Sequence, residues 1–319
     1  MNNSGRKSLG FLRSAYRRLF LRRDNPIRFD FTGQEASDLI KQYLTSDLPC
    51  MICRFGSVEL DAVLRYVDIH APISLARKSL GYIKGEIGSF WWDDRIKHKM
   101  QKNTGFFPAT EEALDQFSQR MIDDIKRIDI LASWQRQDVR LRNHFPEASI
   151  INLHDLESWR HKDPWSFALS TKKVLVVHPF SRTITEQYKK RDKLFANRNV
   201  LPDFELITLK AVQSIGGTKV PYVTWFDALD FMCNQINNTV FDIAIIGAGA
   251  YGLPLASFVK SIGKKGIHMG GSTQLLFGIK GKRWDKHALH TGLYNEHWIR
   301  ASLDEQPDNF KSVEKGCYW

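Results

Sequence analysis

The sequence predicts an α/β protein with three layers, in which helices cover both faces of a mostly parallel sheet built from Rossmann-like βαβ units. Two observations predict this class. Short apolar runs bounded by glycine or proline alternate with helix-period stretches through the second half of the chain. Residues 241–271 also follow the order strand, glycine turn, helix, strand, and two parallel strands need such a crossover.

The unit at 241–271 directs two glycine turns to one place. Residues 243–246 form an apolar run typical of a buried strand, 253–260 have helical spacing, and 266–269 form the next strand. Ligands of such sheets bind beyond the carboxyl ends of the strands. The candidate phosphate-binding positions in the two turns are therefore Gly247, Gly249, Gly270 and Gly271.

The first of these turns, Gly247 to Gly252, matches the G-x-G-x-x-G dinucleotide fingerprint and lies between a strand and a helix. That fingerprint also requires an acid at the end of the next strand, where this chain has His268 and Met269. Three interpretations stay open: an NAD or FAD site, glycines that only allow close packing, or a different nucleotide or phosphate at the helix N-terminus.

Composition favours a globular protein with a large core. The chain has 319 residues, of which 43% are hydrophobic and 25% charged, and its net charge is +11. The four cysteines are too few for a disulfide scaffold, and Cys50-Met-Ile-Cys53 lies in a strand-like run, which favours buried cysteines over a redox motif. There is no apolar stretch long enough to span a membrane and no signal-peptide pattern, so a cytoplasmic protein is expected.

Residues 1–25 form a basic N-terminal arm. Apolar residues share one helical face between 6 and 23, opposite arginines, and this stretch has no acid. A basic amphipathic helix of this kind binds an anionic membrane surface, here the inner face of the membrane. The alternative is a disordered basic arm. Nucleic acid is not expected as a partner, because the rest of the chain has no comparable basic run.

The remaining elements follow in order, within a domain predicted at 26–285 and before a C-terminal tail at 286–319 that is expected to pack on it. Apolar runs and helical periodicity predict strands at 48–55, 128–133, 173–178 and 204–209, and helices at 34–46, 110–127, 183–196 and 225–236.

The strand at 48–55 leads through Gly56 into a helix, and this corner contains candidate functional residues. Ser57 is a natural N-cap, and Glu59 falls in the first turn, where a carboxylate gains about 0.3–1 kcal/mol from the helix dipole. The alternative is that Glu59 is held beside a ligand, with Arg54 as a cation that faces a phosphate.

Other candidates lie later in the chain. Asp155 and Glu157 lie in a short loop and could act as a base, and His178 stands at the carboxyl end of its strand. The remaining candidate phosphate-binding cations are Arg182, Lys280, Lys282 and Arg283, the last three in a glycine-spaced segment expected to be a flexible loop. The aromatic and acidic cluster at 90–94 suits sugar stacking or a helix edge.

Two stretches together resemble the GT-D fold glycosyltransferases and their GT-D-like relatives of bacterial surface-polysaccharide clusters. Cys53-Arg-Phe-Gly-Ser-Val-Glu-Leu60 is similar to that family's R-F-G-D-G-E corner, and 174–182 with 241–271 are similar to its C-terminal half. The family's first metal-binding acid falls on Ser57 and its second on Glu59.

The resemblance implies a glycosyltransferase that moves a sugar from a nucleotide-sugar donor, expected to be UDP-linked, to a surface-polysaccharide acceptor that can be lipid-linked. Glu59, Asp155 and Glu157 are the expected catalytic acids. Mn²⁺ or Mg²⁺ would bind at Glu59, although one carboxylate and a hydroxyl make a poor site unless substrate phosphates complete it. The alternatives are a Rossmann-type NAD-dependent oxidoreductase and a non-enzymatic nucleotide-sugar-binding assembly subunit.

Overall fold

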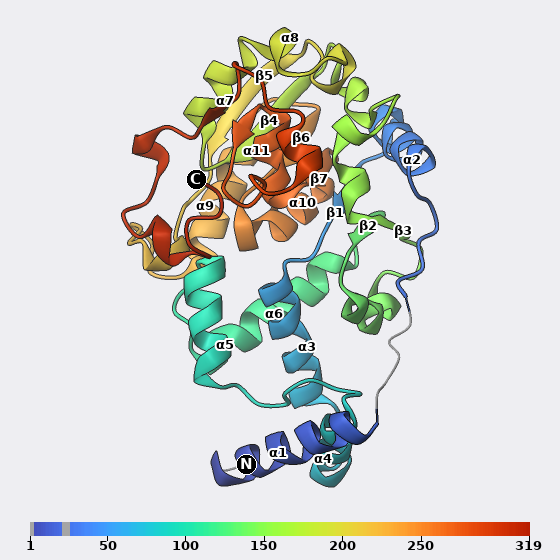
Figure 1. Cartoon of the computed structure of the whole chain (residues 1–319), viewed down its shortest axis with the longest axis vertical. Helices are drawn as coiled ribbons and strands as arrows, with labels where there is room; N and C mark the ends of the chain where they lie inside the picture. Colours follow the sequence, from blue (N-terminus) through green and yellow to red (C-terminus); the bar gives the residue numbers. More distant parts are fainter. Residues whose placement is uncertain (1–2, 21–25) are drawn as a thin grey trace.

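The apolar runs of the sequence form the strands of one sheet. The computed structural model describes residues 3–20 and 26–319, and Figure 1 shows the sheet in the upper half of the molecule. Its seven strands are all parallel, in the order β3-β2-β1-β7-β6-β4-β5. The strands are β1 Cys50–Cys53, β2 Ile130–Ser133, β3 Ser149–Asn152, β4 Lys173–His178, β5 Glu205–Lys210, β6 Ile243–Ile246 and β7 Lys265–His268. The predicted α/β class, with a Rossmann-like sheet flanked by helices, is confirmed.

Helices precede the first strand, connect the strands and follow β7. They are α1 Asn3–Leu19, α2 Gln34–Thr45, α3 Ser57–His70, α4 Leu75–Lys84, α5 Asp94–Lys99, α6 Glu111–Ile125, α7 Ser181–Tyr188, α8 Arg191–Leu194, α9 Trp225–Asn237, α10 Gly252–Ser261, α11 Thr273–Leu276 and α12 Ala288–Thr291. A π-helical turn, Met100–Thr104, follows α5 directly. No helix within residues 3–20 and 26–319 is long and apolar enough to cross a bilayer.

The predicted helix at 183–196 is wrong in its length, because it is broken after Tyr188. The chain turns there, the Tyr188 ring packs on Phe204, and the Tyr188 hydroxyl accepts a hydrogen bond from the Phe204 N–H at 2.7 Å. Leu194 and Phe195 can then reach the core from the separate helix α8 and the residue after it.

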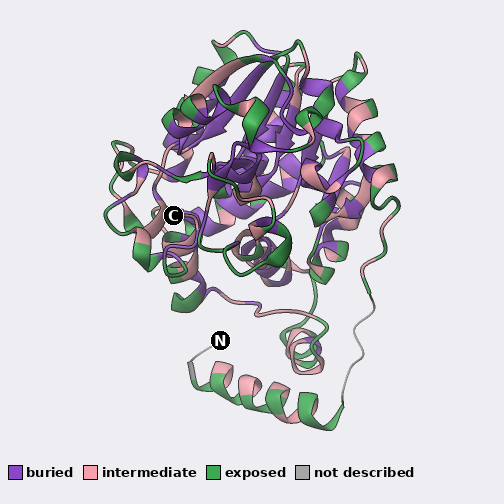
Figure 2. Cartoon of the chain, turned by 45° about the horizontal axis from the view of Figure 1, so that its top comes forward, coloured by how far each residue is buried: buried purple, intermediate pink, exposed green. Residues whose placement is uncertain are grey.

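Successive residues of each strand enter opposite halves of the core, as the pleat requires. In β6, Ala244 and Ile246 belong to one cluster with α3, α6, α9 and α10, while Ile243 and Ile245 face α2, α7 and α11. Figure 2 shows the sheet and the inner sides of its helices buried. Because both faces are covered, the central strands β1, β4 and β6 are continuous apolar runs rather than alternating ones.

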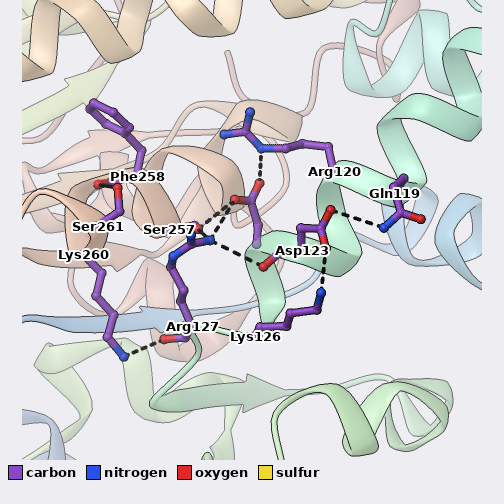
Figure 3. A network of polar contacts seen from close by, with 10 residues as sticks. Gln119, Arg120, Asp123, Lys126, Arg127, Ser257, Phe258, Lys260 and Ser261 are labelled. Atoms are coloured by element: carbon purple, nitrogen blue, oxygen red, sulfur yellow. Dashed lines mark hydrogen bonds and ion pairs between the residues drawn. The ribbon is translucent and has the colours of Figure 1, made fainter.

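A polar network fastens α6 to α10 on the first of these faces (Figure 3). The Ser257 hydroxyl of α10 donates to the buried Asp124 carboxylate at 2.7 Å, and Arg120 donates to the same carboxylate at 2.8 Å. Lys260 reaches from α10 to the backbone oxygen of Arg127 at 2.8 Å. The two helices therefore hold one orientation relative to each other, and α10 is the helix that follows the first glycine turn.

The centre of the sheet is a topological switch point. β1 pairs with β2 on one side and with β7 on the other, with Cys50 opposite Lys265 and Ile52 opposite Ile267. The first three strands extend outward in one direction from this junction and the others in the opposite direction. In open α/β sheets the ligand crevice lies outside the carboxyl ends of the strands at such a point.

Of the segment predicted as a flexible loop, Lys280 instead belongs to a short strand, whereas residues 281–283 lie in a turn that is hydrogen-bonded to the tail. Ile279–Lys280 forms a short strand, β8, parallel to β9, Ile299–Arg300. The backbone N–H of Arg283 donates to the Cys317 oxygen at 2.8 Å. Residues 310–319 thereby lie against the domain, where Trp319 packs on Phe180.

Candidate functional site

A cavity of about 430 Å³ opens at the switch point. The carboxyl ends of β1, β4, β6 and β7 contribute Arg54, His178, Gly247 and His268 to its wall. Most of the remaining wall comes from the start of α3, the π-helical turn, the residues after β5 and the segment 314–319. Those residues include Ser57, Val58, Glu59, Asn103, Thr104, Val212, Gln213, Ser214, Ile215, Glu314, Tyr318 and Trp319.

Glu59 closes the N-terminus of α3 with its own side chain. Gly56, the residue before the helix, has no side chain to cap it, and the Glu59 carboxylate accepts the backbone N–H groups of Val58 and Glu59 instead. Burial in the cavity wall raises the pKa of Glu59, and these hydrogen bonds and the charge of Arg54 offset only part of that rise. The carboxyl group is therefore a stronger base than an exposed glutamate.

Arg54 lies on the other side of the same corner. Its guanidinium stacks over the Trp134 ring at 5.4 Å, and its Nε has no hydrogen-bond partner among the described residues. Burial lowers the pKa of Arg54, and the nearby Glu59 carboxylate opposes that shift. A buried donor without a partner is costly, so this cation is suited to an anionic or polar ligand in the cavity.

Two buried histidines complete the polar wall, and their hydrogen bonds fix which nitrogen carries the proton. The Phe180 N–H donates to Nδ1 of His178 at 3.0 Å, so the neutral ring has its proton on Nε2. Nδ1 of His268 lies 3.2 Å from the Ile246 carbonyl, which can only accept, so His268 keeps a lone pair on Nε2. Burial lowers the pKa of each histidine to about 3.

The glycines of the turns make room for these four side chains. A Cβ atom at Gly56 would overlap the Glu59 carboxylate, and one at Gly252 would overlap the His268 ring. A Cβ at Gly247 would lie 2.5 Å from His178, and one at Gly270 would lie 3.0 Å from the Arg54 guanidinium. Of the three interpretations of the G-x-G-x-x-G turn, close packing accounts for Gly252, the third glycine of the pattern, because the His268 ring lies over it.

A second cation reaches the cavity from the segment after β8. Arg283 donates to the Glu314 carboxylate at 2.5 Å and stacks over the Tyr318 ring at 4.6 Å. Burial would lower the pKa of Arg283, but Tyr318, Cys317 and Glu314 raise it. The Arg283 guanidinium is thus held charged by residues of the tail.

The walls between these groups are aromatic. Tyr251 stacks on Trp225 with ring centroids 4.8 Å apart, and its hydroxyl lies 3.0 Å from the Ser214 hydroxyl. Thr104 ends the π-helical turn at the cavity, and such turns occur frequently at functional sites. Flat apolar walls with a few convergent polar groups are typical of small-molecule sites.

The structure brings together ten of the fifteen positions predicted from the sequence. They are Arg54, Gly56, Ser57, Glu59, His178, Gly247, Gly249, Gly270, Gly271 and Arg283. The other five are not among the cavity-lining residues. They are Asp155, Glu157, Arg182, Lys280 and Lys282.

Each of these five is held elsewhere. Asp155 accepts the Gly33 N–H at 3.2 Å. Glu157 pairs with Arg160 and with His290; burial would raise the pKa of Glu157, but these partners outweigh it and lower that pKa. Arg182 forms an ion pair with Asp304 at 2.6 Å. The Lys280 ammonium lies 5.2 Å from the centre of the Tyr294 ring, and Lys282 donates to the Lys315 backbone oxygen at 3.3 Å.

Several cavity residues were not predicted. Trp134 directly follows β2 and His268 ends β7, so the rule that selected His178 could have found both. Glu314 and Tyr318 lie in a segment without periodicity, and no signal in the sequence places them at the cavity.

The donor set does not fit the divalent metal that the family motif implies. The corner offers one carboxylate, Glu59, with the Ser57 hydroxyl and the Arg54 cation beside it. Among the described residues no group of three or more His, Cys, Asp or Glu side chains could hold a metal ion. Mg²⁺ and Mn²⁺ prefer several oxygen ligands, so no step is assigned to a metal.

Comparison of the chain with family models, with curated proteins and with solved structures finds no match.

Proposed function

We propose that the protein is a glycosyltransferase that moves a sugar from a nucleotide-sugar donor, UDP-linked by preference, to a surface-polysaccharide precursor. The observation that carries the proposal is the α3 corner, where a carboxyl group with a raised pKa lies beside an arginine in the cavity at the switch point. The resemblance of residues 53–60 to the GT-D fold corner supports the same function.

The cavity suits a sugar diphosphate in size and charge. Its volume of about 430 Å³ lies within the range of roughly 300–1,000 Å³ found for small-molecule sites. Arg54 and Arg283 can neutralise a diphosphate, and the Nε2–H of His178 can donate to it. The aromatic rings offer flat surfaces for the base or the sugar.

In the proposed reaction an acceptor hydroxyl attacks the anomeric carbon of the donor sugar. The new bond forms between that oxygen and the anomeric carbon, while the bond from the anomeric carbon to the diphosphate oxygen breaks. Glu59 takes the proton of the hydroxyl, and the departing diphosphate keeps the bonding electrons beside Arg54 and Arg283. A raised pKa brings the carboxylate closer to the proton affinity that general-base catalysis needs.

Two other functions make different demands on the site. An NAD-dependent oxidoreductase is disfavoured, because no acid that could bind the adenosine ribose ends or follows β7. A nucleotide-sugar-binding subunit without activity is the second candidate, since Ser57 replaces the family's first acid.

The decisive experiment compares sugar-nucleotide turnover by the wild-type chain and Glu59→Gln, each with manganese and with EDTA. We expect the substitution to lower turnover by about a hundredfold or more, and EDTA to leave the wild type unchanged. Glu35→Gln is the matched control, because Glu35 occupies the first turn of α2 but is not at the cavity; it should keep full activity.

Near-normal turnover by Glu59→Gln would remove the α3 corner from the chemistry. Binding of UDP without any turnover by the wild type would favour the binding subunit. Ser57→Asp rebuilds the acid pair of the family motif, and we expect it to create manganese dependence.

A further inference from the structure

The N-terminal helix is docked on the protein rather than held away from it. Arg6 donates to the Trp92 backbone oxygen at 3.1 Å, and Arg13 donates to the Ile87 oxygen at 3.1 Å. The Arg13 guanidinium also lies 4.5 Å from the Tyr82 ring of α4. Figure 1 shows α1 and α4 together at the end of the molecule farthest from the sheet. We call residues 3–20 and 75–84 the α1–α4 platform.

The platform leaves large apolar side chains uncovered on both helices. Phe11 and Leu19 of α1 are 75% and 77% exposed, and Leu75 of α4 is 58% exposed. Figure 2 shows exposed residues along the side of α1 that faces away from the rest of the chain. The large apolar residues of the platform that are exposed are Phe11, Leu12, Leu19, Phe20, Leu75 and Leu80.

The charge of the platform has one sign. Neither α1 nor α4 contains an acidic residue. Arg6 and Arg13 are engaged with the body of the protein, so the cations left to face outward from α1 are Lys7, Arg17 and Arg18, which are exposed. On α4, Arg77 is exposed too. Apolar side chains bordered by cations complement a surface that is apolar below and anionic above, which is the boundary of an anionic bilayer.

We propose that the α1–α4 platform is a rigid site for an anionic phospholipid membrane. Phe11 and Leu19 enter the boundary between headgroups and acyl chains, and Arg17 and Arg18 contact the lipid phosphates. Because Arg6 and Arg13 hold α1 on the body, binding fixes the orientation of the whole protein instead of tethering it by a loose arm. The proposal does not depend on sugar transfer and is tested without it.

The test measures how the full chain partitions onto phosphatidylcholine vesicles with and without phosphatidylglycerol. We expect the wild type to bind the anionic vesicles and to be released by salt. Phe11→Ser with Leu19→Ser should lower the bound-to-free ratio by about tenfold or more. Arg17→Gln with Arg18→Gln should lower it by about fivefold for each charge.

A matched control separates the platform from general hydrophobicity. Leu48 is 72% exposed and lies just before the amino end of β1, whereas the carboxyl end of β1 leads into α3. Leu48→Ser should bind vesicles as the wild type does. Leu75→Ser with Leu80→Ser tests α4, and we expect at least a threefold loss.

The remaining outcomes overturn the proposal. They are absence of wild-type binding to anionic vesicles, equal binding to vesicles of phosphatidylcholine alone, and undiminished binding by either pair of serine variants. A dimer in sedimentation velocity that Phe11→Ser with Leu19→Ser dissolves would assign the surface to a second copy of the chain.

Discussion

At the scale of single residues, the cavity combines groups whose charges are set by burial. Glu59 has a raised pKa, while His178 and His268 are kept neutral by their low pKa. Each histidine has one ring nitrogen engaged with the backbone and the other left for a ligand, one as a donor and one as an acceptor. Such opposed roles within one wall allow the site to position both a hydroxyl and a phosphate oxygen.

The low pKa of His178 makes stability depend on pH. The unfolded chain binds a proton at this histidine below about 6.5, whereas the folded chain does so only near 3. The stabilisation is therefore present above pH 6.5 and is lost as the pH falls toward 3. The slope contributed by one such histidine is about 1.4 kcal/mol per pH unit.

His178→Asn tests this dependence, because the asparagine side chain can still accept the Phe180 N–H. We expect urea unfolding at a series of pH values to show a shallower loss of stability for this variant than for the wild type. His154→Asn, at an exposed position, should leave the slope unchanged. Parallel pH curves for His178→Asn and the wild type would contradict the neutral, buried histidine.

At the scale of elements, the first glycine turn, Gly247 to Gly252, allows α10 to pack closely against β7. Gly252 begins α10 with φ −60°, a conformation open to any residue, so the reason for glycine there is the His268 ring. We expect Gly252→Ala to lower the free energy of unfolding by about 1–3 kcal/mol, the usual cost of overpacking. Urea unfolding measures this change.

Gly81→Ala is the matched control, since Gly81 is a helical glycine of α4 whose added Cβ would have contacts of 3.6 Å or more. We expect Gly81→Ala to raise the free energy of unfolding by about 0.5–1 kcal/mol, because alanine lowers the entropy of the unfolded chain. His268→Ala should recover part of the loss in Gly252→Ala, and strict additivity of the two changes would show that the ring is not the obstacle.

The same elements show what the sequence could predict of the fold. β1, β4 and β6 were predictable because strands buried on both faces are continuous apolar runs. β3 was missed because Ser149–Asn152 lies at the edge of the sheet and is mostly only half-buried, so it has no such run. The break after Tyr188 was missed because it depends on Phe204, which is distant in sequence.

The candidate site was predictable where it depends on strand ends. Arg54 and His178 were selected because they end or follow apolar runs, and the topology brings those ends together. Asp155 was selected as an acid in a short loop with no predicted strand before it, and it follows β3 at the edge of the sheet, away from the junction of β1 and β7. Tyr318 was not predicted, because it lies in the C-terminal tail, whose position depends on tertiary contacts.

At the scale of the whole molecule, the cavity joins the two halves of the sheet to the tail, so a ligand in it should stabilise all three together. We expect UDP to raise the melting temperature more than NAD at equal concentration, because the strand that ends at His268 lacks the acid that binds the adenosine ribose of NAD. A ligand at a hundred times its Kd stabilises by about 2.7 kcal/mol. Differential scanning fluorimetry measures the shift.

Arg54→Gln should reduce the shift caused by UDP. Arg182→Gln should not, because Arg182 is 68% exposed and pairs with Asp304 away from the cavity. A larger shift with NAD than with UDP would favour the oxidoreductase instead.

The pairing of β1 with β7 also governs how the chain can be assembled. β1 ends at Cys53, but its inner neighbour is complete only at His268. During synthesis at about 5–20 residues per second, β1 would therefore wait roughly 10–40 s before that neighbour leaves the ribosome. Until then one edge of β1 has no native partner, and an unpaired apolar edge is prone to pair with other chains. The junction that creates the cavity is thus the last part of the sheet to form and the step at which newly made chains are most exposed to aggregation.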